Sequence, residues 1–338
     1  MYFRDFFVIL TLLVLVPGIA LAQSNDEDDT SPYSEAVLIS EFDHVVPGSP
    51  FTLALKMQMD PGWHSYWQNP GDSGEPTEIE WELPATFSTS PIQWPYPHRI
   101  DLGPLRSYGY SDEVVLLTEI SPPPDLEPGT ELHIQAMAYW LICEEICLPA
   151  EEAVSITLPV RSENPSATEH RKAFDTARAQ LPKTLENWTF EASSYAGSYV
   201  LQVTPPAGED IDFNGAYFFT SGYEVIDHPA AQPITQEGNT YLIALQQSEY
   251  ATGAVEHLEG VLVATEGSSW NEHEYVPALS INVPVNAGQY ATSPQESSTS
   301  VSLIWMLVLA FAGGLLLNLM PCVFPILSIK VLGFAKQG

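Results

Sequence analysis

The chain has 338 residues, with 11 Lys and Arg against 43 Asp and Glu, giving a formal net charge of −32 at pH 7. This acidity argues against nucleic acid and anionic lipid as partners. It is compatible with a functional surface, a calcium-rich site or adaptation to high salt. Because the acidic residues are scattered, we favour a solvated, salt-tolerant surface.

Residues 1–22 have the features of a secretory signal peptide. An early charge, Arg4, precedes an apolar run over residues 6–16, and the segment ends in Ala20-Leu21-Ala22. This ending fits an A-x-A cleavage site and predicts a mature chain that begins near Gln23. An uncleaved anchor helix is the alternative. Residues 23–32 form an acidic leader.

Residues 33–160 predict a β-sandwich, because short apolar segments are separated by breaks such as Pro47-Gly48 and Pro70-Gly71. The expected strands contain residues 37–39, 51–55, 79–81, 114–117 and 132–136. Residues 161–187 predict a helical connector, in which a capping box at 166–169 precedes Phe174, Ala177 and Leu181 on one helical face.

Residues 188–285 predict a second sandwich. Its expected strands contain residues 199–201, 217–219, 241–245 and 261–263. The two regions end similarly, at residues 155–160 and 280–285, which fits two related immunoglobulin-like domains in tandem. The chain between the two apolar ends, roughly 280 residues, is long enough for two domains. Residues 286–300 form a polar linker.

Residues 301–338 predict one transmembrane helix, apolar from about Val301 to Ile329. A span needs roughly 20 such residues. Lys330 and Lys336 follow it, which places the C-terminal side in the cytoplasm and residues 23–300 outside. The sequence ends soon after this segment, as expected for a truncated membrane domain.

Two of the three cysteines, Cys143 and Cys147, lie four residues apart. In a straight strand their α-carbons would be about 13 Å apart, too far for a disulfide. A tight hairpin with residues 144–146 as its loop would bring them to about 4.5–5.5 Å, and a single helical turn would also serve. A disulfide is therefore feasible only if the chain turns here.

Such a bond is either a structural staple, as is common in exported domains, or a redox site. Closing so short a loop stabilises the fold by only about 2 kcal/mol, and an exposed disulfide in a turn is open to an attacking thiolate. The carboxylates of Glu144 and Glu145 disfavour a neighbouring thiolate, which suits an electron acceptor.

The third cysteine, Cys322, is flanked by Pro321 and Pro325 inside the membrane segment. Prolines break the helix there, and the freed backbone groups need protein or water partners. The alternatives are a small apolar core residue and a functional thiol.

Several motifs together resemble the extracytoplasmic N-terminal domain of DsbD-type thiol:disulfide interchange proteins, in particular the ScsB-like branch with two periplasmic β-domains. The motifs are residues 62–74 (GWHSYWQNPGDSG), Trp94-Pro95, residues 108–110 and the segment from Cys143 to Pro149. Residues 320–325 resemble the start of the DsbD membrane domain.

The resemblance implies a protein-disulfide reductase of the inner membrane, without a cofactor. Electrons would pass from cytoplasmic thioredoxin through a membrane cysteine pair and a C-terminal thioredoxin-like domain to Cys143 and Cys147. These would reduce periplasmic thiol-disulfide proteins, including clients linked to cytochrome c maturation. Cys322 would be one half of the membrane pair. Its partner, the remaining membrane helices and the thioredoxin-like domain do not occur in this sequence.

His64, Tyr66 and Trp67, with Trp63, form an aromatic cluster that can shield the cysteine pair or simply belong to the core. The other histidines lack ligand spacing, so no metal site is expected. The main rival hypothesis is an acidic, membrane-tethered β-sandwich that binds a metal or a partner and carries a structural disulfide. A copper-handling protein that acts through its thiols is a third.

Overall fold

The protein is mainly β, as the sequence predicts. The computed structural model describes residues 33–287 apart from positions 210, 254 and 272, together with Leu307 and Phe311. The expected signal peptide, the acidic leader, most of the linker and membrane segment, and Cys322 lie outside the described residues. Within the part that the structure describes, no helix is long and apolar enough to cross a membrane.

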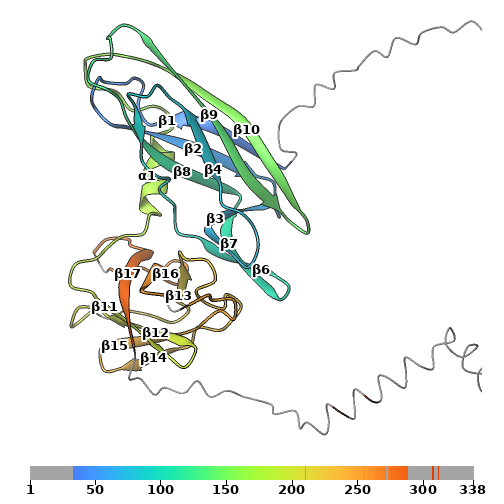
Figure 1. The fold of residues 1–338 in the computed structure, drawn as a ribbon. Helices are drawn as coiled ribbons and strands as arrows, with labels where there is room; N and C mark the ends of the chain where they lie inside the picture. The colour runs from blue at the N-terminus through green and yellow to red at the C-terminus, as the bar shows by residue number, and fades with distance from the viewer. Residues whose placement is uncertain are drawn as a thin grey trace, which may run out of the picture. The chain divides into compact units, whose positions relative to one another are not determined.

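The first β region folds into two sheets that enclose one core (Figure 1). One sheet has the strand order β1-β2-β8-β5, and the other has the order β10-β9-β3-β7-β6, with β4 also paired to β9. The strands are β1 (Ser34–Ser40), β2 (Phe51–Met59), β3 (His64–Gly71), β4 (Glu78–Glu82), β5 (Ser88–Thr89), β6 (His98–Leu102), β7 (Leu105–Ser111), β8 (Glu113–Ser121), β9 (Glu131–Cys143) and β10 (Cys147–Pro159). All five expected strands lie within these bounds.

Strand β9 shows why this region folds as a sandwich. Every even-numbered residue from Leu132 to Ile142 is buried in the core, whereas the odd-numbered positions up to Leu141 are exposed or half-buried. Successive side chains of a strand point to opposite faces, so this alternation buries one face of the sheet. Fully burying one such aliphatic side chain stabilises the fold by about 1.5–3 kcal/mol.

The helix α1 (Arg171–Ala179) covers the outer face of the first sheet. Phe174 and Ala177 are buried against Val115 and Leu117 of β8, so the expected apolar face is confirmed. The expected capping box is wrong. The helix begins after His170, which makes no side-chain cap, while the hydroxyl of Thr168 donates to the backbone oxygen of Ser40.

The second β region forms a seven-stranded sheet of order β13-β16-β17-β11-β12-β15-β14. Its strands are β11 (Thr189–Tyr195), β12 (Ser198–Thr204), β13 (Tyr217–Thr220), β14 (Ile234–Glu237), β15 (Thr240–Gln246), β16 (His257–Val263) and β17 (Ala278–Ala287). Strand β17 pairs with β16 over most of its length and with β11 through its last residues. The sheet thereby encloses its own core around Trp188 and Trp270.

The two β regions are in contact and belong to one compact unit of the chain. Along β13, Phe218 lies in the second core, whereas Tyr217 and Phe219 belong to the core cluster of the first region. Phe219 packs edge-on against Trp67 and Tyr108. Both faces of β13 are therefore buried, one by each region.

Candidate functional site

Cys143 and Cys147 form a disulfide across a tight hairpin. Cys143 ends β9, Cys147 begins β10, and the two are directly opposite in the antiparallel register with their α-carbons 4.2 Å apart. The expected hairpin with residues 144–146 as its loop is confirmed, and the α-carbon separation is slightly shorter than expected. The disulfide needs this turn, because residues at such a spacing in one strand cannot meet.

The two cysteines differ in burial. Cys143 is 1% exposed, whereas Cys147 is exposed at the start of the edge strand β10. Ile146, the last loop residue, is 61% exposed. Of the two residues, Cys147 is therefore the one that solvent reaches.

Cys143 is buried on the outward face of its sheet, where alternation predicts exposure. Its neighbour in the sheet is His64 of β3, and the neighbour of His64 is Ser111 of β7. Cys147, Cys143, His64 and Ser111 thus form one row across four strands. His64 is itself 4% exposed, so the outward face is locally covered at this row.

A hydrogen-bonded chain leads to the exposed sulfur. Nε2 of His64 lies 3.3 Å from the hydroxyl oxygen of Tyr66, which lies 3.6 Å from Sγ of Cys147. A disulfide sulfur has no proton to give, so the Tyr66 hydroxyl donates to Cys147. That hydroxyl has one proton, so it accepts from His64, which assigns the Nε2–H tautomer to the imidazole.

Burial sets the charge state of both partners. It lowers the pKa of His64 to about 4, with a smaller contribution from nearby His98, so the imidazole is neutral at pH 7. Burial also raises the pKa of the Tyr66 phenol, which therefore keeps its proton. The donor at Cys147 is thus a neutral hydroxyl over the whole physiological pH range.

The other residues singled out from the sequence are placed differently. Glu144 and Glu145 are exposed in the hairpin loop, and the carboxylate of Glu144 lies against the backbone of Gly62. Trp67 lies in the hydrophobic core, and Trp63 stacks on Tyr33 with ring centroids 3.9 Å apart. Of the aromatic cluster, Tyr66 contacts the disulfide directly.

Three residues near the site were missed by the sequence analysis. Ser111 extends the row next to His64, and His98 bonds to its hydroxyl at 3.1 Å. Gly74 packs so closely on the ring of Tyr66 that a Cβ there would lie 2.3 Å from a ring carbon. Its φ of +111° also favours glycine. The sequence signal for this contact was Gly74 itself, the last residue of the 62–74 motif.

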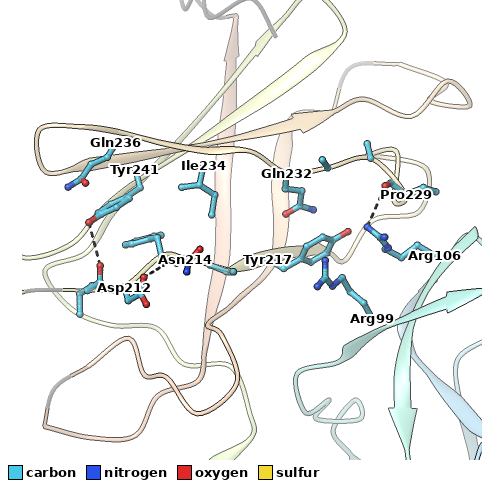
Figure 2. Close-up of a pocket in the computed structure, with 16 residues that line it drawn as sticks. Arg99, Arg106, Asp212, Asn214, Tyr217, Pro229, Gln232, Ile234, Gln236 and Tyr241 are labelled. Atoms are coloured by element: carbon cyan, nitrogen blue, oxygen red, sulfur yellow. Dashed lines mark hydrogen bonds between the residues drawn. The ribbon is translucent and has the colours of Figure 1, made fainter. Parts of the chain in front are cut away.

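A cavity of about 750 Å³ lies apart from the cysteines (Figure 2). Arg99 and Arg106 reach it from the first β region, and Tyr217, Gln232 and Tyr241 line it from the second. Figure 2 shows Arg106 pointing to the backbone oxygen of Pro229, a contact of 3.4 Å. Neither cysteine of the pair lines this cavity. Among the described residues, no group of three or more His, Cys, Asp or Glu could hold a metal ion.

A disulfide between adjacent strands, with one exposed cysteine, is compatible with thiol–disulfide exchange, in which a thiolate attacks one disulfide sulfur. Residues 36–159 match the family described as thiol:disulfide interchange protein DsbD, N-terminal. Residues 36–159 are therefore similar to the N-terminal domain of DsbD-type thiol:disulfide interchange proteins. No curated protein sequence matches it significantly.

Among solved structures, the fold is similar to the N-terminal periplasmic domain of ScsB from Proteus mirabilis. The TM-score is 0.54 at 17% identity, covering 75% of this chain and 92% of that one. A protein of unknown function from Porphyromonas gingivalis W83 matches at a TM-score of 0.21 and 10% identity, over 74% of this chain and 96% of that one. The ScsB match shows that the fold of this chain is ScsB-like.

Proposed function

We propose that this chain passes reducing equivalents to disulfides of periplasmic proteins through Cys143 and Cys147. The observation that carries the proposal is the pairing of an exposed Cys147 with a buried Cys143 across one hairpin. A structural staple needs no reachable sulfur, whereas exchange requires one sulfur that a second protein can approach.

The burial difference assigns a role to each cysteine. In the reduced protein, the Cys147 thiolate attacks the client disulfide, a mixed disulfide forms, and one client thiolate leaves. The Cys143 thiolate then attacks Sγ of Cys147, the Cys143–Cys147 bond forms again, and the second client thiolate leaves. Two electrons and the two thiol protons pass to the client. Tyr66 assists by donating a hydrogen bond to the Cys147 thiolate.

The reverse exchange recharges the pair, with a donor dithiol attacking the exposed sulfur of Cys147. We propose that this donor is the C-terminal thioredoxin-like domain of the DsbD family, supplied with electrons from cytoplasmic thioredoxin through the membrane. Cys322 would serve as half of the membrane cysteine pair, and the clients would include proteins of cytochrome c maturation. The match of residues 36–159 to the DsbD N-terminal family supports this part of the proposal.

The proposed arrangement in the cell follows from the sequence. Residues 1–22 would be a signal peptide and residues 301–338 the first transmembrane helix, with residues 23–300 in the periplasm. Residues 33–160 and 188–285 would be two immunoglobulin-like domains. The separate core of the second region supports the two-domain division.

The reduction potential of the pair tests the exchange function. Equilibration of the full chain with glutathione buffers should give a value above about −300 mV, the region of labile and catalytic disulfides. A value well below that would mark a structural bond and favour the rival binding module. The periplasmic placement has its own test: a maleimide that does not cross membranes should label Cys147 of a Cys143→Ser chain in intact cells after the outer membrane is permeabilised.

A further inference from the structure

The second β region contacts the strand that carries His64 and Tyr66. This strand, β3, continues from Tyr66 into residues 68–72, and that segment bonds repeatedly to residues 220–228. The contacts involve side chains from both regions and backbone oxygens, so they fix the segment from several directions.

Asn69 makes the most buried of these contacts. It is 0% exposed, and its side-chain amide donates to the backbone oxygens of Thr220 at 2.7 Å and Gly222 at 3.0 Å. Its side-chain oxygen accepts from the backbone N–H of Gly71 at 3.1 Å. The Asn69 side chain therefore bonds both to the backbone at the end of β3 and to the backbone of the second region. A buried amide that loses such partners destabilises the fold, because its polar groups then have neither protein nor water to bond.

Two further pairs support Asn69. The side-chain amide of Gln68 donates to the Ser221 hydroxyl at 3.0 Å, and the Tyr223 hydroxyl donates to the backbone oxygen of Gln68 at 3.0 Å. On the other side, Nδ1 of His228 lies 2.9 Å from the carboxylate of Asp72. His228 is 4% exposed, whereas Asp72 is partly exposed.

The same segment leads directly to the redox site. Asp72 lies two residues before Gly74, and the backbone of Gly74 packs on the ring of Tyr66. The second carboxylate oxygen of Asp72 accepts from the backbone N–H of Arg106 at 2.7 Å, which anchors the turn to β7. The position of the Tyr66 ring thus depends on a turn that is held from the second region.

We propose that residues 220–228 of the second β region hold Tyr66 against Cys147, with Asn69 and Asp72 as the positioning residues. This inference rests on the proposed exchange function and assigns a task to the second region. Displacement of Tyr66 by even about 1 Å would lengthen its 3.6 Å contact with the Cys147 sulfur beyond the range of a hydrogen bond. A thiolate that loses a hydrogen-bond donor is less stable, so the pKa of its thiol rises.

The test measures the pKa of the Cys147 thiol in the full chain with Cys143→Ser, from the pH dependence of alkylation. Tyr66→Phe should reduce the acid dissociation constant roughly threefold to tenfold, the equivalent of one hydrogen bond. Asn69→Ala should shift it in the same direction. In the chain that also carries Tyr66→Phe, Asn69→Ala should have no further effect.

A matched control removes the same chemistry elsewhere. Asn239 also donates its amide to a backbone oxygen, that of Pro205 at 2.8 Å, within the second region. Asn239→Ala should leave the Cys147 pKa unchanged. Should Asn69→Ala prevent folding, Tyr223→Phe replaces it, because it removes a single hydroxyl contact from a residue that is 58% exposed.

The outcomes are separable. An unchanged Cys147 pKa in both Asn69→Ala and Tyr223→Phe would overturn the inference. The inference would also fail if Asn69→Ala shifted the Cys147 pKa equally in the chain with Tyr66 and in the chain with Tyr66→Phe. Failure of the wild-type pair to exchange with glutathione would overturn the proposed function instead, while the single-cysteine chains would still decide whether the second region positions Tyr66.

Discussion

Cys143 and Cys147 are partners in one register pair, yet Cys143 is 1% exposed and Cys147 is exposed. The hairpin creates this difference, because the end of β9 is paired on both sides whereas β10 is an edge strand. His64 of β3 lies next to Cys143 in the sheet. Cys147 has a strand neighbour on one side only, because β10 is at the edge of the sheet. The asymmetry predicts different reactivity for the two thiols of the reduced protein.

We expect a single-cysteine chain with Cys143→Ser to be alkylated at least about tenfold faster than one with Cys147→Ser, since reactivity follows exposure. Iodoacetamide rates followed by mass spectrometry give this ratio, and the denatured chains serve as the control, because both thiols are then equally accessible. Equal rates in the folded chains would contradict the assignment of Cys147 as the attacking residue.

Gly74 allows a further prediction about Tyr66. In Gly74→Ala, the new methyl group meets the Tyr66 ring, and the backbone must keep a φ of +111°. The strained backbone costs about 1–3 kcal/mol and the overpacking a further 1–3 kcal/mol. Gly129→Ala is the matched control, because Gly129 has a φ of +94° and open space around it.

Denaturant unfolding should therefore show a larger loss of stability for Gly74→Ala than for Gly129→Ala. In the Cys143→Ser chain, the pKa of the Cys147 thiol should rise with Gly74→Ala and should not change with Gly129→Ala. If both variants lost the same free energy of unfolding and kept the Cys147 pKa, the close packing of Gly74 on Tyr66 would have no functional consequence.

The strands and the hairpin were predictable because they depend on local patterns. Alternation along β9 indicates a strand, and the cysteine spacing restricts a disulfide to a hairpin or a helical turn, without knowledge of the rest of the fold. The helix position was predictable from Phe174 and Ala177, but its start was not, because Thr168 bonds to Ser40 of a strand over a hundred residues earlier. Long-range hydrogen bonds leave no trace in local sequence.

The contacts of the site were less predictable for the same reason. His64 and Tyr66 stood in a recognisable motif, but their alignment with Cys143 and Cys147 depends on the register of β3 with β9. The run of apolar residues at 217–219 indicated a strand, yet only the structure shows that Tyr217 and Phe219 belong to the core of the first region. Asn69 belongs to the 62–74 motif, in which no role of its own could be assigned to it from the sequence, although it bonds to a residue about 150 positions away.

The acidic loop beside Cys147 permits a prediction about charge. Glu144 and Glu145 are exposed, and their carboxylates oppose formation of a nearby thiolate. In the Cys143→Ser chain, replacing both with Gln should lower the Cys147 pKa by a few tenths of a unit to about one unit. Exposed charges are screened, so the difference should shrink when the salt concentration rises to 1 M.

The control for this charge effect is Glu151→Gln with Glu131→Gln, which removes two exposed acids from the same hairpin strands at a greater distance from Cys147. A Cys147 pKa that responds equally to the two pairs would assign the effect to net charge. A pKa that did not respond to the loop pair would remove Glu144 and Glu145 from the site.

His64 predicts a dependence of stability on pH. Its pKa is about 4 in the folded protein because the imidazole is buried, whereas an unfolded His titrates near 6.5. Between these values the unfolded chain binds a proton that the folded chain does not, so stability falls as the pH falls from 6.5 to 4. The full difference corresponds to about 3 kcal/mol, which is present above pH 6.5 and lost below pH 4.

In the oxidised chain, His64→Gln should therefore reduce the difference in unfolding free energy between pH 7 and pH 4.5 by about 2–3 kcal/mol. His133→Gln is the control, because His133 is an exposed residue of the same sheet and its replacement should leave that difference unchanged. Comparison with wild type at each pH cancels the titration of the many carboxylates that all the chains share. If the pH dependence of His64→Gln matched that of wild type, His64 would be accessible to protons in the folded state, and the proposed cover over Cys143 would be open to solvent.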